Sequence, residues 1–157
     1  RNANETDNSR RMKSELLTKM EESFQSDKVF ILAATNYPWD LDEALLRRFQ
    51  KRIYVPLPDQ EAREQLIKTS LGDLIDADFN FHEFATKLDG YSCTDIINLC
   101  RDAAHGVLEA NMDCLDINAQ VIVTNQIFRK AIKNRKSSIP SDIVSQYEEW
   151  KQQYGAE

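Results

Sequence analysis

Strand-forming patterns occupy only one short part of the chain, and this limits its possible folds more than any other feature. Residues 29–34 form a continuous apolar run that ends shortly before Pro38, which predicts a strand covered on both faces. Ile53 and Val55 alternate in a second short strand that ends at Pro56. Two strands cannot form an independent sheet, because an isolated pair buries too little and parallel strands need crossover helices. The missing partner strands must come from an upstream part of a longer protein or from another chain.

The rest of the chain is predicted to be helical. Ser9 can cap a first helix that has a core-directed face of Met12, Leu16, Leu17, Met20 and Phe24. Asp40 or Asp42 can cap a short helix that runs through Arg48. Beyond Pro58, helical apolar patterns follow Asp59, Asn80, Ser92, Thr124 and Ser141.

The predicted fold class is therefore an α/β part followed by an all-α part. We place the boundaries at residues 1–57 for the α/β part, 58–138 for a helical bundle and 139–157 for a C-terminal helix. The predicted bundle core consists of Leu66, Ile67, Phe84, Leu88, Ile96, Leu99, Val107, Phe128 and Ile132.

Composition excludes several functional classes. The net charge of −6 is shared by both halves of the chain, so bulk nucleic-acid binding is disfavoured. Three cysteines without CxxC spacing and two histidines predict neither a disulfide framework nor a zinc site. The longest run without a polar residue is far too short to cross a bilayer, so we expect a soluble intracellular protein without a membrane partner.

Glycine is scarce, which bears on phosphate chemistry. The four glycines do not have the spacing of a GxxxxGK[ST] or GxGxxG loop, whose backbone N–H groups wrap phosphates. Asp42 and Glu43 follow a polar stretch rather than an apolar strand, so we interpret them as a helix start and not as a Mg²⁺-binding pair.

Several motifs resemble the second half of an AAA+ ATPase module. They are VFILAATNYPWDLDEALLRRF at residues 29–49, KRIYVPLP at 51–58 and RRMKSELL at 10–17. The subgroup they resemble includes katanin, spastin, fidgetin and the endosomal-sorting ATPase. GYSCTDI at 90–96 and YEEW at 147–150 are most similar to katanin-type members. The resemblance implies the end of the nucleotide-binding α/β subdomain, a helical lid and a C-terminal helix.

The resemblance assigns catalytic roles to three residues. Asn36 corresponds to the sensor that orients the attacking water, a role that suits an amide at a strand's carboxyl end. Arg47 and Arg48 correspond to paired arginine fingers that act in the neighbouring subunit's site. Without the resemblance, Asn36 would simply start a turn, and two cations in the last turn of a short helix would match its dipole.

The resemblance also assigns nucleotide contacts to the start of the lid helix. Gly90, Cys93 and Thr94 would lie against adenine and ribose. Cys93 stands where the family has a glycine, so its side chain either narrows the adenine pocket or turns away from it. A helix capped by Ser92, with Asp95 at its third position and a buried Cys93, explains the same residues without a ligand.

As a whole, the resemblance implies an ATP- and Mg²⁺-dependent hexamer that severs microtubules by drawing tubulin tails through its pore. The Mg²⁺ ligands and phosphate loop fall outside the 157 residues, so this chain alone is expected to be inactive. The implied location is the cytoplasm and cytoskeleton, at microtubules, spindle or centrosome, and the implied further partner is a regulatory subunit. The alternatives are a non-catalytic module that binds such rings, an endosomal-sorting-type disassembly ATPase and, less favoured, a clamp-loader-like ATPase acting on nucleic acid.

Some polar residues lie outside these assignments. Five cations between Arg129 and Lys136 are interpreted as a solvated, dipole-matched helix end, with contact to a microtubule or to nucleic acid as the alternative. Packing or surface positions are expected for the remaining cysteines and histidines: Cys100, Cys114, His82 and His105.

Overall fold

The computed structural model describes residues 7–24, 26, 28–112 and 122–155. It divides into two compact units, each described here by itself. The N-terminal unit comprises Arg1–Ile53 and Trp150–Glu157, and the helical unit comprises Tyr54–Glu149. Within the described part of the chain, no helix is both long and apolar enough to cross a membrane.

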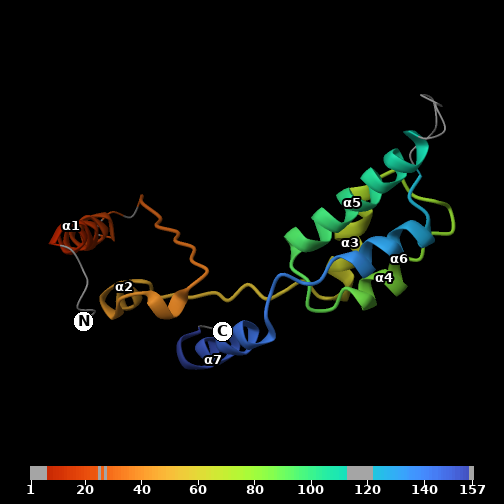
Figure 1. The fold of residues 1–157 in the computed structure, drawn as a ribbon. Helices are drawn as coiled ribbons and strands as arrows, with labels where there is room; N and C mark the ends of the chain where they lie inside the picture. Colours follow the sequence, from red (N-terminus) through yellow and green to blue (C-terminus); the bar gives the residue numbers. More distant parts are fainter. Residues whose placement is uncertain (1–6, 25, 27, 113–121, 156–157) are drawn as a thin grey trace. The chain divides into compact units, whose positions relative to one another are not determined.

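The helical unit contains four complete helices (Figure 1): α3 (Gln60–Leu71), α4 (Phe81–Lys87), α5 (Cys93–Met112) and α6 (Asn125–Asn134). Three of them start at the predicted side-chain caps. Asp59 accepts a hydrogen bond from the Ala62 N–H at 2.8 Å, and Asn80 accepts one from the Glu83 N–H at 3.0 Å. Thr124 caps α6 through the Ile127 N–H at 3.5 Å. Local sequence therefore sets where these helices begin.

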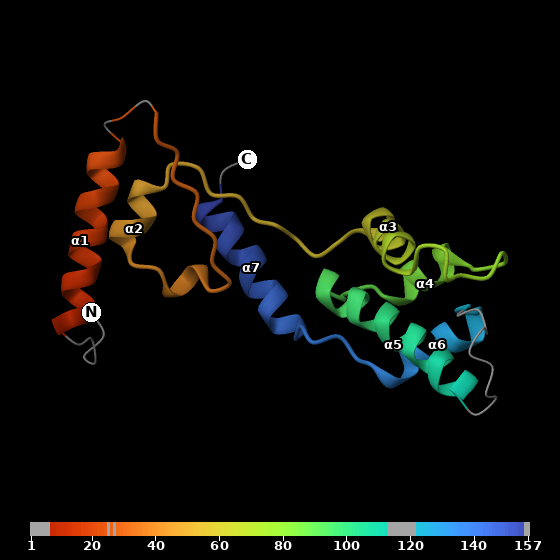
Figure 2. The same cartoon turned by 90° about the horizontal axis from the view of Figure 1, so that it is seen from above.

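Helix α5 is the centre of this unit. It packs against α3 and against α6, and α4 packs against α3 (Figure 2). An isolated parallel bridge between Ile75 and Val123 joins the segment after α3 to the residues before α6.

The predicted core is confirmed. Seven of its nine residues are buried, and Leu66 and Ile132 pack against them partly exposed. Residues outside the predicted set complete the core: Leu71, Phe79, Cys100, Ala103 and Val123. Phe79 contacts the rings of Phe84 and Phe128 at centroid distances of 5.0 and 5.2 Å.

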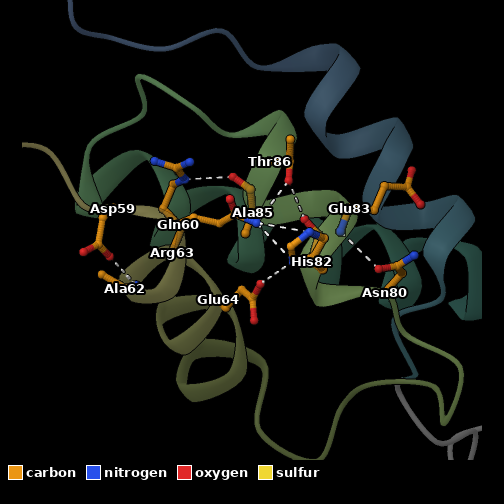
Figure 3. Close-up of polar contacts among 10 residues, drawn as sticks. All are labelled: Asp59, Gln60, Ala62, Arg63, Glu64, Asn80, His82, Glu83, Ala85 and Thr86. Carbon is orange, nitrogen blue, oxygen red and sulfur yellow. Dashed lines mark hydrogen bonds and ion pairs between the residues drawn. The ribbon is translucent and has the colours of Figure 1, made fainter.

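One charged side chain lies inside the helical unit. Arg63 of α3 is 6% exposed and donates to the Ala85 and Pro58 carbonyls, both at 2.8 Å (Figure 3). It also pairs with Asp89 at 3.1 Å. These contacts satisfy the buried guanidinium and fasten the segment before α3 to the end of α4.

The N-terminal unit contains α1 (Asp7–Phe24), the 3₁₀ turn η1 (Pro38–Asp40) and α2 (Glu43–Arg48). Asp42 caps α2 by accepting from the Ala44 N–H at 2.9 Å, which confirms its interpretation as a helix start. Helix α1 already begins at Asp7, so the predicted cap at Ser9 is wrong. Met20 is the one member of its predicted apolar face that is buried.

The predicted strands do not pair in the described residues. Residues 29–34 and 53–55 lie outside any ladder, and Phe30 and Leu32 are 98% and 92% exposed. The prediction that residues 29–34 are covered on both faces is therefore wrong for this chain. A strand gains its hydrogen bonds and its burial from neighbours, and the described residues supply none. Helix α7 (Ser141–Tyr154) starts at Ser141 itself, directly after Pro140.

Candidate functional site

Asn36 lies in an exposed bend between the apolar run and η1. The Tyr37 N–H donates to the Thr35 hydroxyl at 3.1 Å, and Pro38, which begins η1, is buried. The neighbours on both sides thus hold the backbone at Asn36, while the residue itself faces solvent.

Arg47 is an exposed cation in the last turn of α2. Its side chain is 79% exposed and pairs with Glu43, one turn earlier, at 3.1 Å. An exposed pair at this helical spacing contributes on the order of 0.5 kcal/mol or less. The guanidinium can therefore leave Glu43 for another anion at little cost.

Arg48 is held inside the N-terminal unit. Its side chain is 26% exposed, donates to the Ala44 carbonyl at 2.8 Å and forms an ion pair with Glu21 of α1. These contacts tie α2 to α1. The adjacent arginines therefore occupy different environments, which their identical side chains did not indicate.

Arg47, unlike Arg48, borders an open pocket of about 220 Å³. The other lining residues are Glu43, Leu46, Arg52 and Tyr154. Two guanidinium groups face one carboxylate around this space, so its charge favours a small anion or an acidic side chain. Arg52 also donates to the Leu46 carbonyl at 3.4 Å, which fixes its stem beside α2.

The start of α5 carries the predicted nucleotide contacts. Gly90 adopts φ +78°, a left-handed conformation that favours glycine. Cys93 and Thr94 are exposed at the first positions of α5. The alternative that Cys93 is a buried core residue is therefore wrong, because its side chain lies on the open side of the helix start.

The capping box at this helix start forms as predicted. The Asp95 N–H donates to Ser92 Oγ at 3.1 Å, and the Ser92 N–H donates back to the Asp95 carboxylate at 3.2 Å. Asp95 also accepts from the Ser92 hydroxyl at 2.8 Å. Two more donors come from Ser138, its N–H at 3.3 Å and its hydroxyl at 2.9 Å.

Asp95 is 5% exposed, so its ionisation depends on these donors. Burial alone raises the pKa of the carboxyl group, but the hydrogen bonds from Ser92 and Ser138 outweigh it and lower the pKa below its usual value. The buried carboxylate therefore stays ionised at neutral pH. Sequence reasoning recognised its partner in the capping box but not Ser138, which is 43 residues away.

The remaining histidine and cysteine predictions divide three ways. Burial raises the pKa of the Cys100 thiol to about 12, and His105 is exposed. His82 contacts Gln60 at 3.0 Å and Glu64 at 3.1 Å on the surface between α3 and α4 (Figure 3). Packing and surface positions are thus confirmed for these three residues. Cys114 lies outside the described residues.

The basic cluster is partly neutralised by its own unit. Arg129 forms two hydrogen bonds to Glu83, at 3.0 and 2.8 Å, and Arg135 pairs with Asp102 at 2.7 Å. Hydrogen bonds from Arg129 and Lys87 lower the pKa of Glu83 to about 2. This part of the cluster fastens α6 to α4 and α5, which favours the structural interpretation of the cations.

The structure thus groups the predicted site residues by unit. Asn36, Arg47 and Arg48 lie in the N-terminal unit, and Gly90, Cys93 and Thr94 lie together in the helical unit. Buried Arg63 and the Asp95–Ser138 contact were not predicted. An arginine within the apolar pattern of α3 was a usable signal for the first, whereas only the tertiary structure reveals the second.

Comparison with known families agrees with both groups. Residues 1–57 match the model of the "ATPase family associated with various cellular activities (AAA)", and residues 78–121 match the "AAA+ lid domain". Among curated relatives, the chain is 39% identical to the A-like 1 form of the katanin p60 ATPase-containing protein of Homo sapiens, over 98% of the chain and 35% of the relative. It is 40% identical to the meiotic spindle formation protein mei-1 of Caenorhabditis elegans, over 99% of the chain and 36% of the relative. The chain therefore spans about a third of the length of these relatives.

Solved structures give the same result at the level of the fold. A crystal structure of the FIGL-1 AAA domain in complex with ADP superposes with a TM-score of 0.86 at 31% identity, covering 98% of this chain and 55% of that one. A structure described as the basis for katanin self-assembly superposes with a TM-score of 0.76 at 38% identity, covering 93% of this chain and 54% of that one.

Proposed function

Because this chain is the C-terminal portion of an AAA ATPase module with its lid domain, we propose that it serves a katanin-like ATPase that severs microtubules. In that complete protein, ATP hydrolysis in a hexameric ring would be coupled to extraction of tubulin. The katanin and mei-1 relatives, and the FIGL-1 complex with ADP, support nucleotide binding and this choice of subgroup. A cytoskeletal or spindle location is part of the same proposal.

The contrast between Arg47 and Arg48 carries the catalytic part of the proposal. Arg47 is exposed beside an anion-favouring pocket and held by one weak pair, so it can serve as the finger that reaches a neighbouring subunit's phosphates. Arg48 is engaged with α1 through Glu21, so its role would be to position α2 and thereby Arg47. The two arginines then act as finger and support.

The lid residues fit a nucleotide's base and sugar. Gly90, Cys93 and Thr94 present an open, uncharged surface on which a flat ring can lie, and the Cys93 thiol does not occupy the core. Bound ATP would supply the phosphoryl group that is transferred to water. Asn36, on its exposed bend, would orient that water through its amide. The Mg²⁺ ligands would come from outside these residues.

The test uses the complete protein and compares Arg47→Ala, Arg48→Ala and Glu21→Gln. We expect Arg47→Ala to lower kcat on the order of 10³-fold with nearly unchanged nucleotide affinity. Glu21→Gln should reproduce the smaller loss caused by Arg48→Ala but not the loss caused by Arg47→Ala. Mixing Arg47→Ala subunits with subunits that lack a functional phosphate loop tests action between neighbours, because only a finger acting in trans can be complemented.

Two outcomes contradict the proposal. If Arg47→Ala lowers activity only by weakening nucleotide binding, the arginine is not a finger. If the complete protein hydrolyses ATP but releases no tubulin from stabilised microtubules, and instead disassembles endosomal-sorting polymers, the substrate assignment is wrong while the ATPase assignment stands.

A further inference from the structure

The connector between α6 and α7, residues 135–140, is fastened to the helical unit by two serines. Ser137 Oγ donates to the Gly90 carbonyl at 2.8 Å. Ser138 donates through both its N–H and its hydroxyl to buried Asp95, at 3.3 and 2.9 Å. The start of α5 is thereby joined to a segment some 40 residues later in the chain, and none of these contacts belongs to the proposed catalytic machinery.

The Asp95 carboxylate makes this contact sensitive to charge. Four hydrogen bonds from two serines compensate its burial, and two of the four come from Ser138. A second negative group at Ser138 would lose the hydroxyl donor and place like charges within a few ångströms in a desolvated position. The interaction would then change from attraction to repulsion.

The residues around Ser138 have the pattern that basic-directed protein kinases select. Relative to Ser138, Arg135 lies at −3, Lys136 at −2 and the apolar Ile139 at +1. Kinases with acidic substrate grooves select their serines through such upstream cations. The connector is not helical, and Ser138 is exposed, so the segment can be presented in an extended form.

Ser14 provides an internal comparison. It also has an arginine at −3, Arg11, but it lies in the middle of α1 and its carbonyl accepts a hydrogen bond from Thr18. Phosphorylation there would require a helical turn to open. The conformation of the chain therefore favours Ser138 over Ser14, although part of the sequence pattern is shared.

We propose that Ser138 is a phosphorylation site for such a kinase, and that its phosphate releases the connector from the start of α5. In the transfer, Ser138 Oγ forms a bond to the γ-phosphorus of the kinase's ATP. The bond to the bridging oxygen of ADP breaks, and the hydroxyl proton passes to the kinase's base. The product carries about −1.5 to −2 charges beside the Asp95 carboxylate.

The local cations do not cancel this repulsion. Arg135 is engaged with Asp102 at 2.7 Å, and its carbonyl accepts from the Tyr91 hydroxyl at 2.9 Å. Lys136 is exposed, where an ion pair is worth little. The Ser92 N–H at the start of α5 is already bonded to Asp95. Release of residues 137–138 therefore costs less than keeping phosphate and carboxylate together.

The modification is tested on the 157-residue chain with the catalytic subunit of cyclic-AMP-dependent protein kinase, ATP and Mg²⁺, followed by mass-spectrometric mapping. We expect near-stoichiometric phosphate on Ser138, lost in Ser138→Ala and retained in Ser137→Ala. Phosphate mainly on Ser137 or Ser14, or on neither of these nor Ser138, overturns the site assignment.

The release is tested by amide exchange of residues 92–96 in the same phosphorylated chain. We expect these amides to exchange about tenfold faster after phosphorylation, with Leu99 and its neighbours in α5 unchanged. Asp95→Asn is the matched variant, because it keeps an acceptor oxygen but removes the charge. In that background phosphorylation should accelerate exchange by less than about threefold. Equal acceleration in both backgrounds, or slower exchange after phosphorylation, overturns the charge-driven release.

Discussion

The two units of this chain are built from comparably apolar segments, yet only one of them encloses its apolar residues. In the helical unit, Phe84, Leu99 and Phe128 are fully buried. In the N-terminal unit, Phe30 and Leu32 are almost fully exposed. The difference lies in where the partners are located: helices satisfy their own backbone and need only a neighbouring face, whereas a strand needs other strands. Completeness, rather than hydrophobicity, separates the two units.

The same contrast applies to the proposed site. Exposed Arg47 depends on groups outside its own unit to do chemistry, whereas the contacts of Asp95 are all satisfied within the helical unit. The chain thus combines a self-sufficient helical body with a segment whose function requires completion. The predictions below test how sharp this division is.

The largest effect is expected from the incomplete unit, measured as catalysis. In the complete protein, Arg47→Ala should lower turnover on the order of 10³-fold while leaving the thermal midpoint nearly unchanged, because the exposed pair with Glu43 contributes little to stability. Steady-state kinetics and calorimetry on the same sample check this. A drop in the midpoint that parallels the loss of turnover would make Arg47 a structural residue.

The next effect is thermodynamic and belongs to the complete unit. Leu99→Ala should lower the free energy of unfolding of the helical unit by roughly 2–5 kcal/mol, since Leu99 is fully buried beside Ile96 and Cys100. The matched control is Leu32→Ala in the N-terminal unit, where 92% exposure predicts a change within about 0.5 kcal/mol. Urea denaturation followed by helical circular dichroism measures both. Similar losses in the two variants would remove the distinction between the units.

Amide exchange in the unmodified chain tests the same division without mutation. Amides of α5 should exchange slowly, because the helix is hydrogen-bonded and packed on two sides, whereas residues 29–55 should exchange fast. Ile31→Asp should improve solubility with little loss of helicity, because it interrupts an unpaired apolar run. Equal protection of residues 29–34 and 96–104 in the monomeric chain would reveal a sheet partner within these 157 residues.

The smallest effect is a pH dependence in the helical unit. Hydrogen bonds from Arg129 and Lys87 lower the pKa of Glu83 from 4.5 to about 2. A carboxyl group with a depressed folded-state pKa contributes stability that is fully present above its unfolded pKa and is lost as pH falls toward the folded value. Stability of the helical unit should therefore fall between about pH 4.5 and 2, and Glu83→Gln should flatten that part of the curve. An unchanged acid limb in Glu83→Gln would show that the bonds to Arg129 and Lys87 are not maintained in solution.

The sequence by itself determined the helix starts and the bundle core. Side-chain caps at Asp42, Asp59, Asn80 and Thr124 act on N–H groups two or three residues away, so local sequence suffices to place them. The core followed from helical periodicity, which is also a local property. The family resemblance rested on contiguous motifs for the same reason.

Only the tertiary structure decided what long-range contacts control. It separated Arg47 from Arg48, because the distinction depends on Glu21 of another helix. It exposed the run at residues 29–34, since pairing requires strands that no local pattern can supply. It also brought Ser138 to Asp95 across 43 residues. Periodicity and capping specify which face of a segment is apolar and where the segment begins, but the partner of a buried charge is chosen by the path of the chain in three dimensions.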